Sequence, residues 1–203
     1  MKRLYIVDDH KMMQKGVKDY LEENTDWRVP KTFSKSQECL KALKDAGGRN
    51  ELPQIVIVDV QLLNESGIAL ASQIARDFPS VQCVMYSMYD TAGYIMQAAS
   101  AGVKGYISKV ASEEELVRCL ETVLSGKEYF EGKARGSLEK IEKVSPLLTR
   151  QEKRILEKLL QQKSNEEIAA ELFVSQHTVE NYVSYIYDKL CVKSRAELEA
   201  AFG

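Results

Sequence analysis

The stretch QIVIVDV, residues 54–60, is a short run of β-branched apolar residues that reaches an aspartate at position 59. A run of this length without polar alternation is typical of a strand buried on both faces, as in a parallel sheet covered by helices. The first 125 residues contain four further short runs, RLYIVDD, WRVPKTF, QCVMYSM and KGYISK. Between the runs lie longer segments such as ESGIALASQIARDF and TAGYIMQAASAG, with apolar residues three and four positions apart. This alternation of strands and helices predicts an α/β domain.

The second of these runs contains Pro30, which has no backbone N–H to donate to a neighbouring strand. A proline is accepted on an edge strand, and the flavodoxin-like strand order 2-1-3-4-5 places the second strand at the edge. Right-handed crossovers put helices on both faces of such a sheet. The sequence therefore predicts a doubly wound, five-stranded parallel sheet in the order 2-1-3-4-5.

The alternation of strands and helices ends before the last third of the chain. Residues 126–146 hold several glycines and many charges with little periodicity, which indicates a linker that could include a short helical turn. After them, LTRQEKRILEKLLQQ, SNEEIAAELF, SQHTVENYVSYIYDKL and SRAELEAAF read as four helices. We therefore predict an α/β domain at residues 1–125 and a small all-α domain at residues 147–203. The expected N-caps of the helical domain are Ser164, Ser175 and Ser194.

The composition limits the classes of protein that fit. The chain has 203 residues, 44% hydrophobic and 29% charged, which is typical of a globular protein. A net charge of −2 gives the chain as a whole no signature for nucleic acid or an anionic membrane, so any DNA binding must come from a local surface. The N-terminal apolar run is too short for a signal peptide, and no run approaches the ~18 residues of a membrane span. The four cysteines are widely spaced without a CxxC pattern, and we expect reduced thiols in a cytoplasmic protein.

Five polar side chains stand where four of the predicted strands end: Asp8 and Asp9, Asp59, Ser87, and Lys109. In a doubly wound sheet this edge is the place where ligands bind. Neighbouring carboxylates repel one another unless a cation joins them, and oxygen ligands beside a phosphate suit Mg²⁺. Asp59 could then attack a phosphoryl group while Lys109 and Ser87 contact its oxygens. A lone aspartate at a strand end is usually a turn residue, but five such residues in register favour a site.

The motifs IVDDH, IVIVDV, MYSM and GYISK resemble the receiver domain of bacterial two-component response regulators over about the first 125 residues. The resemblance implies that Asp8 and Asp9 hold Mg²⁺ together with Asp59 and the backbone carbonyl of Gln61. It implies that Asp59 accepts the phosphoryl group of a sensor histidine kinase. It also makes Tyr106 the aromatic switch residue, which swings inward as Ser87 and Lys109 engage the phosphoryl group.

The chain departs from that family pattern at two loops beside the site. Leu63 and Val110 stand where the family commonly has prolines. A cis bond before a residue other than proline costs about 2.5–4 kcal/mol, so the bond between Lys109 and Val110 is expected to be trans. Gln61 and Tyr89 flank the site and could shield an acyl phosphate from water, which would give it an unusual lifetime.

The last 57 residues resemble the LuxR-type helix-turn-helix, and the whole chain resembles response regulators of the NarL/FixJ family. By that resemblance residues 165–172 form the supporting helix and residues 176–190 form the helix that enters the major groove. The helix is poor in cations, because no Lys or Arg lies between Val174 and Asp188 and Glu180 stands where a lysine is frequent. From residue 145 onward eight Lys and Arg face nine Asp and Glu. We therefore expect weak DNA binding by a monomer.

Base reading remains feasible because specificity depends on polar side chains more than on charge. Asn181 can read adenine, and Glu180 can accept a hydrogen bond from a cytosine amino group. Helix N-termini can bind phosphates through backbone amides. The candidate DNA contacts are Ser175, Gln176, His177, Thr178, Glu180, Asn181, Ser184, Tyr185, Lys189 and Lys193.

Three hypotheses follow for the function. The first is a transcription regulator that a sensor kinase phosphorylates on Asp59, and that binds promoter DNA as a homodimer on phosphorylation or on DNA. Such a chain would catalyse only its own phosphorylation and slow dephosphorylation. The second is a receiver whose helical domain has lost DNA and binds a protein partner, which the net charge and Glu180 favour. The third is a flavin protein or Mg²⁺ phosphatase, which DDHKMMQK disfavours because it is acidic and bulky where a Ser/Thr-rich phosphate loop would be needed.

Overall fold

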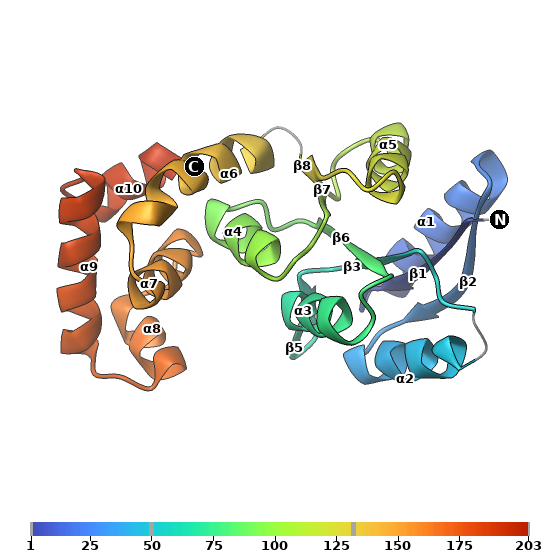
Figure 1. Ribbon diagram of the computed structural model, residues 1–203, viewed down its shortest axis with the longest axis horizontal. Coiled ribbons are helices and arrows are strands. Elements are labelled where there is room, and N and C mark those ends of the chain that lie inside the picture. The colour runs from blue at the N-terminus through green and yellow to red at the C-terminus, as the bar shows by residue number, and fades with distance from the viewer. Residues whose placement is uncertain (1, 49–50, 131–132, 203) are drawn as a thin grey trace. The chain divides into compact units, whose positions relative to one another are not determined.

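The computed structural model describes residues 2–48, 51–130 and 133–202 (Figure 1). The chain divides into two compact units, and each is described by itself. The sheet unit comprises residues 1–89 and 98–131, and the helical unit comprises residues 90–97 and 132–203.

The sheet unit is built on a parallel β-sheet in the order β2-β1-β3-β6-β7-β8. The first five of these strands have the predicted order 2-1-3-4-5, so the prediction of a doubly wound parallel sheet is confirmed. The additional strand β8 has two residues and lies in the segment interpreted as a linker, where it is too short to produce a periodic pattern. The strands are β1 Lys2–Val7, β2 Trp27–Phe33, β3 Ile55–Val58, β6 Gln82–Ser87, β7 Gly105–Ser108 and β8 Tyr129–Phe130.

The edge strand β2 accommodates Pro30 through an irregularity in its pairing with β1. Arg3 is opposite Arg28, but Tyr5 is opposite Lys31, so one extra residue of β2 bulges around the proline. A bulge leaves a residue unpaired, which removes the need for the N–H that proline lacks. The expectation of an edge strand here is confirmed.

Helices cover both faces of the sheet. α1 and α5 share one face, where Leu21 and Leu120 join an apolar cluster with Trp27 of β2. Figure 1 shows α2 and α3 on the opposite side of the sheet. Ser112 caps α5 and Ser66 caps α3 through their side-chain oxygens. The helices of this region are α1 Lys11–Asn24, α2 Ser36–Gly47, α3 Gly67–Asp77, α4 Ala92–Ser100 and α5 Glu113–Leu124, and a small hairpin joins β4 Gln61–Leu62 to β5 Glu65–Ser66.

The helical unit contains all four predicted helices and one that was not predicted. Ser164 forms a full capping box with Glu167, and Ser175 and Ser194 accept hydrogen bonds from backbone amides three residues onward, so the three predicted N-caps are confirmed. The helices are α7 Arg150–Leu160, α8 Asn165–Leu172, α9 Gln176–Leu190 and α10 Arg195–Phe202.

The unpredicted helix is α6, Lys133–Val144, which is followed by the short 3₁₀ helix η1, Ser145–Leu147. The interpretation of residues 126–146 as a linker with at most a short helical turn is therefore corrected, because α6 spans 12 of them. The charges of KARGSLEKIEKV hide an apolar spacing of three, and Ile141 is buried in the apolar cluster of the helical unit. The first turns of α4 also belong to this unit, where Ala92 and Met96 join the same cluster. Among the described residues, every helix is too short or too polar to cross a bilayer.

Candidate functional site

The carboxyl ends of four strands bring the predicted polar residues together. Asp8 follows β1, Asp59 follows β3, Ser87 ends β6 and Lys109 follows β7. Their backbones continue the sheet hydrogen bonding, since the amide of Asp59 donates to Val7 and that of Lys109 donates to Ser87. Asp8, Asp59 and Ser87 are buried, with exposed fractions of 2%, 6% and 0%. The sheet therefore fixes these side chains in one small polar pocket.

Lys109 and Ser87 both contact the carboxylate of Asp59. Lys109 Nζ lies 2.5 Å from Asp59 Oδ2 and 2.7 Å from Asp8 Oδ2. Ser87 Oγ donates a 2.6 Å hydrogen bond to Asp59 Oδ1. Burial alone would lower the pKa of the Lys109 ammonium, but its hydrogen bonds to Asp59 and Asp8 outweigh burial and the pKa is raised. Lys109 is therefore a fixed positive charge beside the Asp59 carboxylate.

The acidic side of the pocket has the donor set of a divalent-cation site. One ligand atom each from Asp8, Asp9, His10 and Asp59 lies within 4.8 Å of the others. Asp9 Oδ1 is buried and accepts no hydrogen bond from the described residues, although His10 Nδ1 lies 2.9 Å from it. A buried carboxylate oxygen without a donor is costly, and a hard cation would satisfy it. His10 is the N-cap residue of α1, but its side chain makes no capping hydrogen bond.

Tyr89 connects the loops around the pocket. Its hydroxyl donates a 2.6 Å hydrogen bond to Gln61 Oε1, and its amide donates a 3.4 Å hydrogen bond to Ser87 Oγ. Its carbonyl accepts a hydrogen bond from the hydroxyl of Tyr106, whose side chain is 2% exposed. In this structure the Tyr106 side chain is therefore buried, and the Ser87 hydroxyl is hydrogen-bonded to Asp59. The sequence indicates that Gln61 and Tyr89 flank the site, but no motif in it predicts the hydrogen bond between their side chains.

Exposed apolar side chains surround this polar pocket. Met12, Leu63, Met88 and Val110 follow the strand ends within five residues and are 90%, 67%, 61% and 76% exposed. A neighbouring surface pocket of about 380 Å³ lies between α1 and α5 and reaches Lys109. The described part of the chain has no cis peptide bond, so the expected trans bond after Lys109 is confirmed. We call these four exposed side chains the apolar rim of the pocket. An exposed apolar surface of this kind is typical of a site that contacts another protein.

The predicted DNA-reading residues share the exposed side of α9. Val179 and Ile186 are buried in the helical core, so the opposite side of the helix faces outward. Thr178 is partly buried and its hydroxyl lies 2.8 Å from Ser175 Oγ, which supports the first turn of the helix. Tyr182 and Tyr185 meet edge to face with ring centroids 6.5 Å apart. The exposed members are Ser175, Gln176, His177, Glu180, Asn181, Ser184, Tyr185 and Lys189, and Lys193 after the helix is exposed as well.

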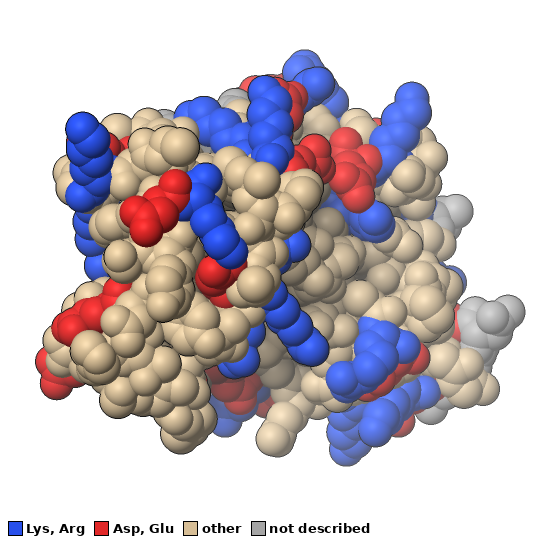
Figure 2. All heavy atoms as spheres, turned by 60° about the vertical axis from the view of Figure 1, so that its left-hand side comes forward, with Lys and Arg blue, Asp and Glu red and all other residues tan. Residues whose placement is uncertain are grey.

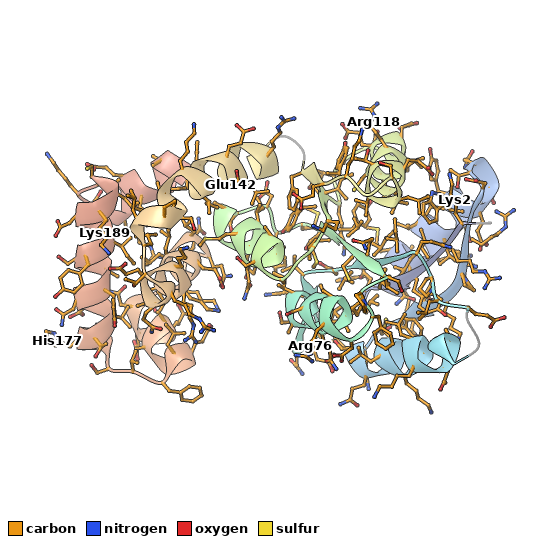
Figure 3. All side chains as sticks on the ribbon, viewed as in Figure 1. Lys2, Arg76, Arg118, Glu142, His177 and Lys189 are labelled. Carbon is orange, nitrogen blue, oxygen red and sulfur yellow. The ribbon has the colours of Figure 1, made fainter. Side chains whose placement is uncertain are left out.

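The cations at the end of α9 and just after it are mostly paired. Figure 3 shows Lys189 and His177 at opposite ends of α9. Lys189 Nζ contacts both carboxylate oxygens of Glu152, at 2.8 and 2.7 Å, and Glu152 is only 4% exposed. Arg195 is bound to Glu199, whereas Lys193 has no side-chain partner among the described residues. Figure 2 shows acidic and basic side chains interspersed on one face of the molecule. These pairings favour Lys193 over Lys189 as a phosphate contact.

The stability that the ion pair of Lys189 and Glu152 contributes depends on pH. Burial alone would raise the pKa of Glu152, but hydrogen bonds from Lys189 and Thr149 outweigh it, so the pKa lies below its usual 4.5. The contribution of the pair to stability is therefore present above that usual value and is lost as the pH falls through the lowered folded value.

Lys189→Met should lower the free energy of unfolding of the helical unit by about 1–3 kcal/mol at neutral pH, because it removes the charged donor of a buried carboxylate and leaves it only the Thr149 amide. Lys193→Met should leave that free energy within about 0.5 kcal/mol of the parent and should reduce the salt slope of duplex binding by about 0.9. Thermal unfolding and binding at several salt concentrations measure the two effects. Equal melting temperatures for the two variants would contradict a structural role for Lys189.

Comparison with known proteins agrees with this geometry. Residues 4–121 match the model of the response regulator receiver domain, and residues 146–200 match that of the bacterial regulatory proteins of the luxR family. The chain belongs to the response regulators. Its receiver and LuxR-type helix-turn-helix make it a two-component transcription regulator of the NarL/FixJ type.

Two curated relatives match this response regulator over nearly its whole length. The transcriptional regulatory protein MctR of Rhizobium johnstonii is 32% identical over 97% of this chain and 90% of its own. The oxygen regulatory protein NreC of Staphylococcus carnosus is 30% identical over 97% of this chain and 94% of its own. Among solved structures, the response regulator RcsB in complex with DNA covers 98% of this chain and 96% of its own, with a TM-score of 0.67 and 23% identity. That structure supports the fold alone.

Proposed function

We propose that a sensor histidine kinase phosphorylates this response regulator on Asp59 and that the phosphoryl group controls DNA binding by the helical unit. The observation that carries the proposal is the pair of contacts on Asp59, from Lys109 at 2.5 Å and from Ser87 at 2.6 Å, beside the carboxylates of Asp8 and Asp9. The apolar rim would receive the kinase.

In the transfer step a carboxylate oxygen of Asp59 attacks the phosphorus of the kinase phosphohistidine. The P–N bond breaks as the P–O bond of an acyl phosphate forms, and the imidazole leaves with the electron pair of the broken bond. The Lys109 ammonium neutralises charge on the phosphoryl oxygens, and the Ser87 hydroxyl can turn from Asp59 Oδ1 to one of them.

Asp8, Asp9 and Asp59, with the backbone carbonyl of Gln61, would hold Mg²⁺ in this site. The bound ion would supply positive charge that the lysine alone does not provide. The buried oxygen Asp9 Oδ1 supports this assignment, because it accepts no hydrogen bond from the described residues.

The signal leaves the pocket through Tyr89. Its backbone amide donates a hydrogen bond to Ser87 Oγ, and its backbone carbonyl accepts a hydrogen bond from the Tyr106 hydroxyl. Movement of Ser87 to a phosphoryl oxygen therefore alters the loop that holds Tyr106 in place. We propose that the resulting change on the receiver surface favours a homodimer, which would join two weak half-site contacts into one stable complex.

Tyr89→Phe should shorten the lifetime of the acyl phosphate by about twofold to tenfold, because it removes one hydrogen bond that holds Gln61 over the pocket. A freed Gln61 amide can also orient an attacking water. Phosphate release from the labelled protein measures the rate. Tyr94→Phe is the matched control on α4. A lifetime that is unchanged or longer in Tyr89→Phe would contradict the covering role of the Tyr89–Gln61 pair.

The proposed function is tested by selecting fragmented genomic DNA with the full-length protein at moderate salt, with and without Mg²⁺ and beryllofluoride as a phosphoryl mimic. We expect enrichment of inverted half-sites only with the mimic. The alternative is a helical unit that binds a protein partner, which the excess of one acidic residue from residue 145 onward and the paired cations favour. No enrichment in either state, with the mimic shown to bind the receiver, would favour that alternative.

A further inference from the structure

The exposed side of α9 that is predicted to read DNA, here called the reading face, comprises residues 175–177, 180, 181, 184 and 185. DNA binding in general does not explain why this face holds a single charged side chain. Between Val174 and Tyr187 the only Lys, Arg, Asp or Glu is Glu180. Glu180 lies on the exposed side of the helix, and its side chain is 48% exposed. A carboxylate that faces DNA is repelled by the phosphates, so it weakens sequence-independent binding. A glutamate at the centre of the reading face would therefore need a specific hydrogen-bond donor on the DNA to offset this repulsion.

Neighbouring side chains hold the Glu180 carboxylate on this face. Gln176 Nε2, one helical turn earlier, donates a 3.0 Å hydrogen bond to Glu180 Oε1. His177 Nδ1 lies 3.9 Å from Oε2, too far for a hydrogen bond. Within the described residues Oε2 thus receives no hydrogen bond, and it remains available as an acceptor. The Gln176 contact reduces the rotamer freedom that Glu180 would lose on binding.

The chemistry of the major groove limits what this acceptor can read. A carboxylate accepts hydrogen bonds and donates none, and the only donors on the base edges are the amino groups of cytosine and adenine. Adenine presents its N7 acceptor beside the amino group, which repels a carboxylate, whereas cytosine has an apolar C–H there. Guanine and thymine offer acceptors alone. We infer that Glu180, held by Gln176, reads a cytosine in each half-site by accepting a hydrogen bond from its amino group.

This inference rests on the proposed function, because it requires the helical unit to bind DNA in the major groove. Given that binding, the cytosine contact sets the preference at one base pair. An Arg or Lys at the same place would select guanine through its N7 and O6 acceptors, and a Gln would favour adenine through its paired donor and acceptor. Exchanging the side chain should therefore exchange the base and not merely weaken the complex.

The test compares four full-length proteins loaded with the beryllofluoride mimic: the parent, Glu180→Gln, Glu180→Lys and Glu142→Gln. Glu142 of α6 is a matched control, because it is exposed and has no hydrogen bond or ion pair among the described residues. Each protein selects duplexes from a random pool. We expect one invariant cytosine for the parent and for Glu142→Gln, adenine there for Glu180→Gln, and guanine for Glu180→Lys. Thermal unfolding checks that the variants are folded.

A chemical probe then isolates the amino group. Replacing the selected cytosine by N4-methylcytosine should weaken binding of the parent by about tenfold or more and should affect Glu180→Lys by less than about twofold. A parent motif that both Glu180 variants reproduce, or equal affinity of the parent for the two cytosines, would overturn the inference while DNA binding stands. A parent that selects no motif at all would instead remove the proposed function on which the inference rests.

Discussion

Asp59→Asn should reduce the uptake of phosphate from acetyl phosphate to background, a loss of about 100-fold or more. An amide is not a nucleophile toward phosphorus, while its size preserves the packing of a residue that is 6% exposed. Uptake is measured by mass spectrometry of the intact protein in the presence of Mg²⁺. Asp45→Asn, an exposed aspartate of α2, is the control and should be phosphorylated like the parent. Undiminished uptake by Asp59→Asn would place the phosphoryl group on another residue.

Among glycine-to-alanine substitutions at the described glycines of the sheet unit, Gly67→Ala should reduce stability the most. A Cβ at Gly67 would lie 1.7 Å from the carbonyl oxygen of Asp59 and 2.8 Å from its carbonyl carbon. Backbone atoms at the end of a central strand cannot move aside without displacing the phosphoacceptor. We expect a loss of about 3 kcal/mol in the free energy of unfolding and at least a tenfold slower uptake of phosphate.

Gly16→Ala is the matched control for this prediction. Gly16 lies within α1, and a Cβ there would have no atom within 4 Å apart from the nearby backbone of its own helix and its chain neighbours. Because alanine favours a helix over glycine, this variant should be more stable by about 0.5–1 kcal/mol and should be phosphorylated normally. Urea denaturation and phosphate uptake distinguish the two glycines. If Gly67→Ala matched Gly16→Ala in both measurements, the close approach to Asp59 would have no functional consequence.

The pocket was largely predictable because its residues follow from strand ends. In a parallel sheet the carboxyl ends meet at one edge, so Asp8, Asp59, Ser87 and Lys109 could be placed together without coordinates. The edge position of β2 followed from Pro30 for a similar reason, since proline lacks a backbone donor. These predictions succeeded because each depends on one local rule with a direct geometric consequence.

The features that were missed depend on contacts between side chains far apart in sequence. Lys189 is predicted as a DNA contact, and nothing in the sequence signals its ion pair with Glu152, 37 residues earlier. Tyr89 and Gln61 are 28 residues apart, and neither belongs to a motif that predicts their hydrogen bond. α6 was missed because its apolar positions are few among many charges, and its core contact through Ile141 becomes visible only in the packed structure.

Control of DNA binding by phosphorylation of Asp59 can be measured in a single titration. The affinity of full-length protein for a selected duplex is measured by fluorescence anisotropy, with and without acetyl phosphate and Mg²⁺, for the parent and for Asp59→Asn. We expect the phosphodonor to tighten duplex binding of the parent by about tenfold or more and to leave that of Asp59→Asn unchanged. Equal affinities of phosphorylated and unphosphorylated parent protein, with phosphate uptake verified in the same sample, would contradict this expectation.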